Sequence, residues 1–344
     1  MLTIVIIYLW TAISLYIITG GADFGAGMIE LITPKKNRKK VIEMMHKSTA
    51  PIWEANHMWL ILAIVILFVG FPISYSEISS SLYIPITIML MGIIARGTSY
   101  AFRNGDTVAD ELKKLDRVIY ISSSIVTPFF LGVIGASIFA DRTILKGNNF
   151  MDKYIFNWFA PFPLLMGLVT VFVCAYLAAI YVIGNKNYGE MRFLIKYQAF
   201  LLTLCIPISL TLANMAARSQ RIDLLACFFT IPGIIALLVI IIIACLMWVI
   251  IISEQTKWLR VYAAAPVLLV QIMLFKGVFN NLSNKSSGQS LISLHVPEKT
   301  IETLAITLIV ASFLILPALG YLIYKFEWQA EENDSSKQES AEKF

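Results

Sequence analysis

Histidine is scarce in this chain, because its 344 residues include only His46, His57 and His295. Haem iron is held by axial side chains, often histidine, so a chain that carried several haems alone would need more buried ligands than this. The four cysteines form no CxxC or CxxCH pattern, and all of them lie within apolar runs. This spacing predicts buried free thiols and argues against disulfides or a metal site.

Charge is also sparse: only 14% of the residues are charged and 58% are hydrophobic, whereas about 25% are charged in an ordinary soluble domain. The apolar runs are about 20 residues long, the length that crosses the hydrocarbon core of a bilayer. Segments of that kind must be helices, because a helix satisfies its own backbone hydrogen bonds in lipid. The net charge of +5 sits in short loops between these runs, which gives no reason to expect a nucleic-acid partner.

We therefore predict an all-α polytopic membrane protein with about nine transmembrane helices. Residues 2–19 lack a basic leading region and continue into a glycine-rich motif, so we interpret them as a first span and not as a signal peptide. The polar segment 37–50 is expected to be an amphipathic helix at the membrane interface. A transmembrane domain would occupy 1–328, and 329–344 would be a disordered acidic cytoplasmic tail. The predicted spans lie near 2–22, 51–74, 82–102, 118–140, 160–184, 196–217, 223–252, 260–282 and 301–325.

The basic residues predict the orientation. Eighteen of the 27 lysines and arginines fall in the odd-numbered loops and the C-terminal segment, and seven fall in the even-numbered loops. Basic loops stay in the cytoplasm, so the N-terminus is expected outside and the C-terminus inside.

Polar residues at the start of the second span form the first candidate site. Glu54 and His57 share one helical face, and Asn56 lies between Trp53 and Trp59. An ionisable group inside hydrocarbon costs roughly 2.5–3.5 kcal/mol, so it is a functional candidate by default. The alternative is an interfacial tryptophan belt with Glu54 solvated among the lipid headgroups. For His57, a hydrogen bond to a neighbour is expected in preference to metal ligation.

Two further clusters lie at the same expected depth. Around Asp23, the glycines Gly20, Gly25 and Gly27 would allow helices to approach closely; a plain packing motif is the alternative to a polar site. In the third span, Arg96 lies about two turns from Arg103. Arg103 can snorkel to the cytoplasm, but Arg96 requires a carboxylate, and Asp23 and Glu54 are both candidates.

At this point the chain resembles the cytochrome bd quinol oxidase subunit II family. The resemblance rests on Gly20-x-x-Asp23-x-Gly25-x-Gly27, on Trp53-Glu54-x-Asn56-x-x-Trp59 and on Arg96-Gly97 followed by Arg103. The order, spacing and location of these motifs in the first three spans are similar to the family's. One departure is Ala101, which stands where many members carry an acidic residue.

The resemblance implies two four-helix bundles plus one extra helix, in a bacterial cytoplasmic membrane. It implies a non-haem subunit of an electrogenic, non-pumping oxidase that reduces O2 to water with electrons from quinol. Haem b and haem d would be carried by the partner, cytochrome bd subunit I. A small accessory single-span subunit and a bound lipid or quinone are left open. Glu54 would help to bring protons from the cytoplasm, with Asp23, Asn56 and Arg96 as supporting positions.

Two other functions fit the same residues. A secondary transporter could bind substrate at Asp23, Glu54 and Arg96, although transporters place such groups near the midplane of the membrane. A purely structural membrane partner would have no proton role at all.

Overall fold

The computed structural model describes residues 1–49, 53–103, 110–140, 149–183, 192–220, 222, 226–253, 259–283, 298–315, 317 and 321. Side chains are described for these residues except 46–49, 53–55, 101–103, 110–113, 192, 226–227 and 275–283. Every regular element in these ranges is a helix, which agrees with the predicted all-α class. The predicted tail, 329–344, lies outside the described residues.

The first helical segment is longer than its predicted span. Helix α1 (Leu2–Leu15), the π-helix η1 (Tyr16–Gly20) and α2 (Gly21–Ile32) follow one another without a break and form a 31-residue helix. The glycine-rich motif therefore does not end the helix. Neighbouring helices can compensate for glycine at membrane depth, and a π-turn supplies the local adjustment here.

The second span is bent at its end. After α3 (Arg38–Thr49) comes α4 (Trp53–Gly70), which is followed by α5 (Pro72–Ser81) at an angle of 117°. Pro72 stands in the first turn of α5, where a missing N–H costs nothing. The helix predicted over 37–50 is present as α3, and its apolar residues Val41, Met44 and Met45 are buried.

The remaining predicted spans each coincide with a described helix. These are α6 (Tyr83–Arg103), α7 (Asp110–Phe139), α9 (Pro161–Ile183), α10 (Arg192–Ser219), α11 (Ile231–Ile252), α12 (Leu259–Ser283) and an unlabelled helix over 298–315. Two short elements, α8 (Phe150–Tyr154) and the 3-10 turn η3 (Ala226–Phe229), lie between them.

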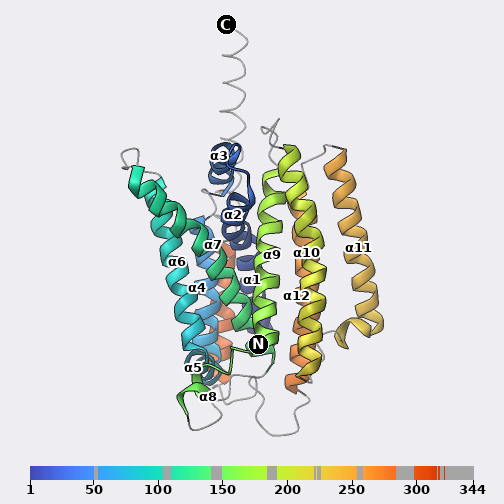
Figure 1. Ribbon diagram of the computed structural model, residues 1–344. Coiled ribbons are helices and arrows are strands. Elements are labelled where there is room, and N and C mark those ends of the chain that lie inside the picture. Colours follow the sequence, from blue (N-terminus) through green and yellow to red (C-terminus); the bar gives the residue numbers. More distant parts are fainter. Residues whose placement is uncertain are drawn as a thin grey trace.

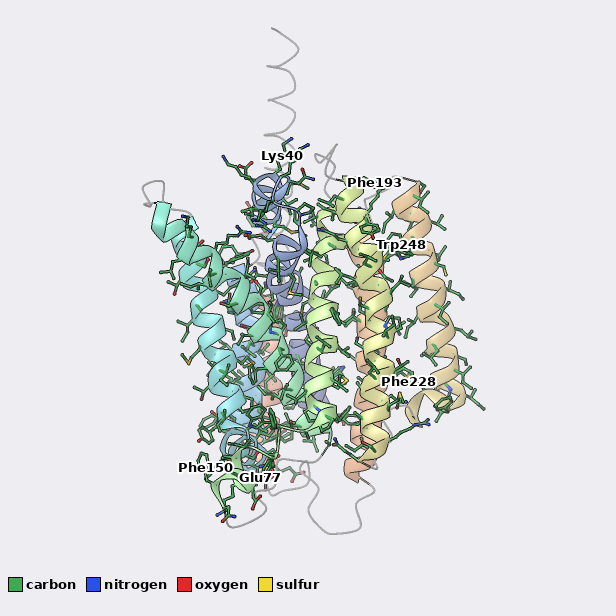
Figure 2. The ribbon with its side chains drawn as sticks, in the orientation of Figure 1. Lys40, Glu77, Phe150, Phe193, Phe228 and Trp248 are labelled. Atoms are coloured by element: carbon green, nitrogen blue, oxygen red, sulfur yellow. The ribbon has the colours of Figure 1, made fainter. Side chains whose placement is uncertain are left out.

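Five described helices are long and apolar enough to cross a membrane, or six if the bent α4–α5 pair is one span. Helices α6 and α12 and the helix over 298–315 lie outside that group. The N-terminus and α3 lie at opposite ends of the helical array (Figure 1). Lys40 of α3 marks one end, and Glu77 of α5 and Phe150 of α8 mark the other (Figure 2).

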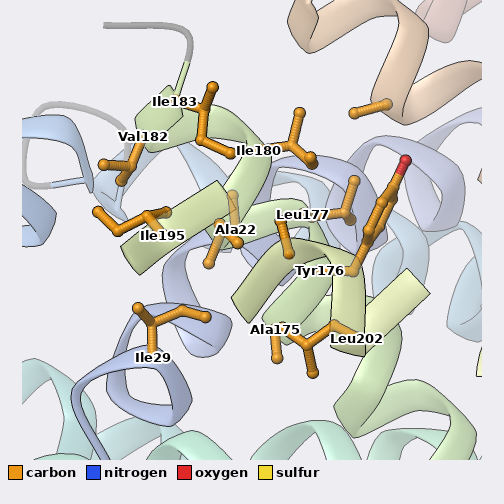
Figure 3. Packing of buried hydrophobic residues seen from close by; sticks show 14 of the residues in the cluster. Ala22, Ile29, Ala175, Tyr176, Leu177, Ile180, Val182, Ile183, Ile195 and Leu202 are labelled. Carbon is orange, nitrogen blue, oxygen red and sulfur yellow. The ribbon is translucent and has the colours of Figure 1, made fainter. Parts of the chain in front are cut away.

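Helix α9 is the centre of the packing. It contacts α2, α7 and α10, and Figure 1 shows it between the α4, α6 and α7 side and the α10, α11 and α12 side. Its alanines Ala175, Ala178 and Ala179 are fully buried, and Figure 3 shows Ala175 among the buried apolar side chains around α9. Small residues let helix backbones approach closely in a membrane, so α9 packs tightly against its neighbours.

A second apolar cluster ties α1 to two other helices. Val5 of α1, Ile66 of α4 and Ala305 of the helix over 298–315 are buried together. Thus α1 faces α4 and 298–315, whereas α2, the continuation of the same helix, faces α7 and α9.

Candidate functional site

Arg96 is the centre of a buried polar site formed by α2, α6 and α7. Its guanidinium lies 3.0 Å from Asp23 Oδ1 and donates to the Tyr120 hydroxyl over 3.1 Å. It also donates to the backbone carbonyl of Asp23 and to the Ser124 hydroxyl. Arg96 has no exposed surface and Asp23 is 2% exposed. An isolated charge would be very costly here, and the pair is tolerated because each charge is matched.

Aromatic rings enclose this ion pair. The Arg96 guanidinium carbon lies 4.0 Å from the centre of the Tyr120 ring, 5.5 Å from that of Tyr100 and 5.7 Å from that of Phe24. The Tyr100 hydroxyl donates to Asp23 Oδ1. Ring faces attract cations, so the rings exclude lipid and also stabilise the guanidinium.

Glycines set the distance between α2 and its neighbours. A Cβ atom at Gly25 would overlap the backbone carbonyl of Cys174 on α9, and one at Gly27 would overlap the Ser124 hydroxyl on α7. At Gly20 a Cβ would meet only the rings of Tyr16 and Phe24, the nearer at an ordinary 3.4 Å. Gly25 therefore brings α2 to backbone contact with α9, and Gly27 makes room for the Ser124 side chain of α7, whereas Gly20 belongs to the π-turn that precedes Asp23.

Helix α4, which carries Asn56 and His57, contacts the π-turn η1 that precedes Asp23. Asn56 is 1% exposed, and both polar atoms of its side chain lack a hydrogen-bond partner among the described residues. The structure thus brings Asp23 and Arg96 together and places α4, which carries Asn56, against the turn that precedes Asp23.

Five other predicted residues fall into two groups, those with described side-chain burial and those without. Trp59 and Gly97 are half-buried, on α4 and α6. The side chains of Trp53, Glu54 and Arg103 lie outside the described ones, although all three residues belong to described helices. The predicted need of Arg96 for a carboxylate is met by Asp23.

Several polar contacts were not predicted from the sequence. The Arg117 Nε donates to Glu30 Oε1 over 2.8 Å, the Ser99 hydroxyl donates to Asp116, and Gln198 donates to the Thr33 hydroxyl over 3.1 Å. The spacing of Glu30 could have identified it as part of this polar face, because it lies seven residues after Asp23 and therefore on the same side of the helix.

The donor set of the Asp23–Arg96 site differs from that of a metal-ion site. No group of three or more His, Cys, Asp or Glu side chains gathers within this part of the chain. Arginine and the surrounding hydroxyls are poor metal ligands. What the site can do is hold a carboxylate, a guanidinium and several hydroxyls in a water-poor space, an arrangement suited to moving or holding protons.

Comparison with known proteins gives the chain a family. A model of the cytochrome bd terminal oxidase subunit II family matches residues 1–326. The chain is 27% identical over 209 residues to the cytochrome bd-I ubiquinol oxidase subunit 2 of Escherichia coli, which covers 58% of this chain and 52% of that protein. It is also 27% identical over 154 residues to the cytochrome bd ubiquinol oxidase subunit 2 of Bacillus subtilis, covering 45% and 44%. The matches thus span about half the length of these relatives.

The fold has a counterpart among solved structures. A chain of the bd oxidase from Geobacillus thermodenitrificans superimposes with a TM-score of 0.69 over 94% of this chain and 98% of the other, at 18% identity. That likeness shows a shared fold. The family match extends over nearly all 344 residues, and the resemblance found in the first three predicted spans is thereby confirmed: this integral membrane protein belongs to the cytochrome bd terminal oxidase subunit II family.

Proposed function

We propose that this chain is the non-haem subunit II of a cytochrome bd-type quinol oxidase in a bacterial cytoplasmic membrane. The complex would oxidise quinol and reduce O2 to water. The observation that carries this proposal is the Asp23–Arg96 site, a fully buried ion pair in a chain of this family. A subunit with only a packing role would have no evident use for such costly groups.

The proposed topology has nine spans in two four-helix bundles plus one extra helix, with the N-terminus outside. The five or six apolar helices supply most of it, and α6, α12 and the helix over 298–315 would complete it. Basic α3 lies at the opposite end from the N-terminus (Figures 1 and 2), which is consistent with a cytoplasmic position for α3.

The proposed partner is the haem-bearing subunit I. Haem b and haem d would be bound there, since this chain has only three histidines to offer as axial ligands. Exposed apolar surface is extensive on several helices, so there is room for contact with subunit I, a small single-span subunit, and a lipid or quinone.

In the proposed proton route, Glu54 takes up protons from the cytoplasmic side and passes them towards subunit I. Asn56, two residues further along α4, supplies a buried donor and a buried acceptor, neither of which has a hydrogen-bond partner among the described residues. Asp23 Oδ2 has no hydrogen-bond partner among the described residues, whereas Oδ1 is occupied by Arg96 and Tyr100. Arg96 would hold Asp23 in place and balance its charge.

Glu54→Gln is expected to lower quinol-dependent oxygen uptake by about tenfold or more, because glutamine cannot carry a proton. The haem content of the complex should not change. Glu77→Gln is the matched control, since Glu77 lies at the other end of the helical array (Figure 2). Equal turnover in Glu54→Gln and the unaltered complex would leave a purely structural subunit as the better interpretation.

The first experiment on the proposal as a whole is purification of the tagged protein from its native membrane in a mild detergent. A reduced-minus-oxidised absorption spectrum with haem b and haem d bands, together with a second large chain, is the expected result. A colourless single chain would refute the oxidase assignment. The buried Asp23–Arg96 pair beside a π-turn would then favour a secondary transporter.

A further inference from the structure

Two polar faces oppose each other where α2 packs on α7. On α2, Asp23 and Glu30 are seven residues apart, so they share one face and are separated by about 10 Å along the axis. On α7, Ser124 lies level with Asp23 and Arg117 lies level with Glu30, because Ser124 and Asp23 both contact Arg96 while Arg117 is bonded to Glu30.

The interval between the two carboxylates is filled by side chains of α7. A Cβ atom at Gly27 would overlap the Ser124 hydroxyl and lie 3.3 Å from the Tyr120 ring. Glycine at this position thus lets Tyr120 and Ser124 lie against α2, between Asp23 and Glu30. Tyr120 accepts a hydrogen bond through its hydroxyl from Arg96, which also donates to Asp23, so polar groups line α7 between the levels of Asp23 and Glu30.

Exposure changes along this interface at Arg117. Asp23, Tyr120 and Glu30 are each 2% exposed or less, whereas the Arg117 side chain is 35% exposed. Glu30 is therefore a buried carboxylate in direct contact with a residue that reaches the surface. Arginine does not release its proton in proteins, so a proton that follows this interface has to be carried by Glu30 and not by Arg117.

We propose that Glu30 is a second proton-uptake carboxylate, which serves Asp23 along the α2–α7 interface and is separate from Glu54 on α4. Glu30 accepts a proton at the surface beside Arg117 and then releases it to Asp23, so that Glu30 is deprotonated again and Asp23, whose Oδ2 has no hydrogen-bond partner among the described residues, is protonated. One proton is transferred and no electron moves. Arg117 holds the carboxylate in position and balances its charge while it is deprotonated. This inference rests on the proposed oxidase function, and it extends the route to a residue outside the motifs of the first three spans.

The test compares four variants of the purified oxidase complex. Glu30→Gln removes the proton carrier, Glu30→Asp retains it, and Arg117→Gln breaks the ion pair but leaves the carboxylate. Glu43→Gln, an exposed residue of α3, controls for loss of negative charge from a helix that contacts α2. Quinol-dependent oxygen uptake is measured in H2O and in D2O, together with haem content and thermal midpoint.

We expect Glu30→Gln to lower turnover by about fivefold to tenfold and to raise the ratio of rates in H2O and D2O, because proton transfer becomes rate-limiting. Glu30→Asp and Arg117→Gln should retain most of the turnover and the ratio of the unaltered complex. Equal losses in Glu30→Gln and Arg117→Gln with lowered midpoints would overturn the inference, since the pair would then be structural. Unchanged turnover in Glu30→Gln would overturn it too.

Glu54→Gln separates this inference from the proposed function. Slow turnover in Glu54→Gln with normal turnover in Glu30→Gln would refute only the role of Glu30. A purified complex without haem or quinol-dependent oxygen uptake would refute both.

Discussion

Replacement of Arg96 by leucine is expected to cost about 3–5 kcal/mol of folding stability, the largest effect of any single change at the site. The variant leaves Asp23 buried, 2% exposed, without its cation, and loss of one member of a buried ion pair has a cost of this order. The hydroxyls of Tyr120 and Ser124 lose their donor as well. The thermal midpoint of the detergent-purified protein is the measurement.

Two variants sharpen this result. Arg218→Leu removes an arginine that is exposed near the end of α10, and it should change the midpoint little. The double variant Asp23→Leu/Arg96→Leu removes both charges, so it should be more stable than Arg96→Leu alone. A double variant that is less stable than either single variant would show that the two side chains act independently.

The second large effect is expected at Gly25. Gly25→Ala places a Cβ atom where the backbone carbonyl of Cys174 lies, so α2 and α9 have to move apart. Overpacking of this kind costs about 1–3 kcal/mol, which exceeds the gain of about 1 kcal/mol that alanine brings to a helix. A lower thermal midpoint and a lower yield of folded protein should follow.

Gly135→Ala is the matched control for Gly25→Ala. It makes the same substitution in α7 at a position where no atom lies within 4 Å of the added Cβ. Only the gain in helix propensity then remains, so this variant should be unchanged or slightly more stable. The same midpoint in both variants would contradict the backbone contact between α2 and α9.

How much of this site follows from the sequence depends on the kind of residue. Arg96 was predicted to need a carboxylate, because an arginine in an apolar run has few alternatives. The choice between Asp23 and Glu54 stayed open, since it depends on how α2 and α6 are rotated against each other. The motif with Gly25 predicted close helix packing, but not that α9 is the partner.

Other parts of the site have no distinctive pattern in the sequence. Tyr100 and Tyr120 look like ordinary core aromatics, and only their contacts with Asp23 and Arg96 distinguish them. Glu30 resembles a carboxylate solvated at the end of a span, yet it is 1% exposed. The π-turn over Tyr16–Gly20 has no recognisable sequence signal.

That π-turn determines which residues of the first helical segment face each neighbouring helix. A residue of an α-helix advances the side-chain direction by about 100°, and a π-turn accommodates one residue more than an α-turn. The extra residue therefore offsets, by about 100°, the sequence positions that face α4 before Tyr16 from those that face α7 and α9 after Gly20. Deletion of one residue between 16 and 20 is expected to shorten the π-turn to an α-turn, while Asp23 keeps its direction relative to α1. The identity of Asp23 is therefore a stricter requirement than the number of residues in this turn.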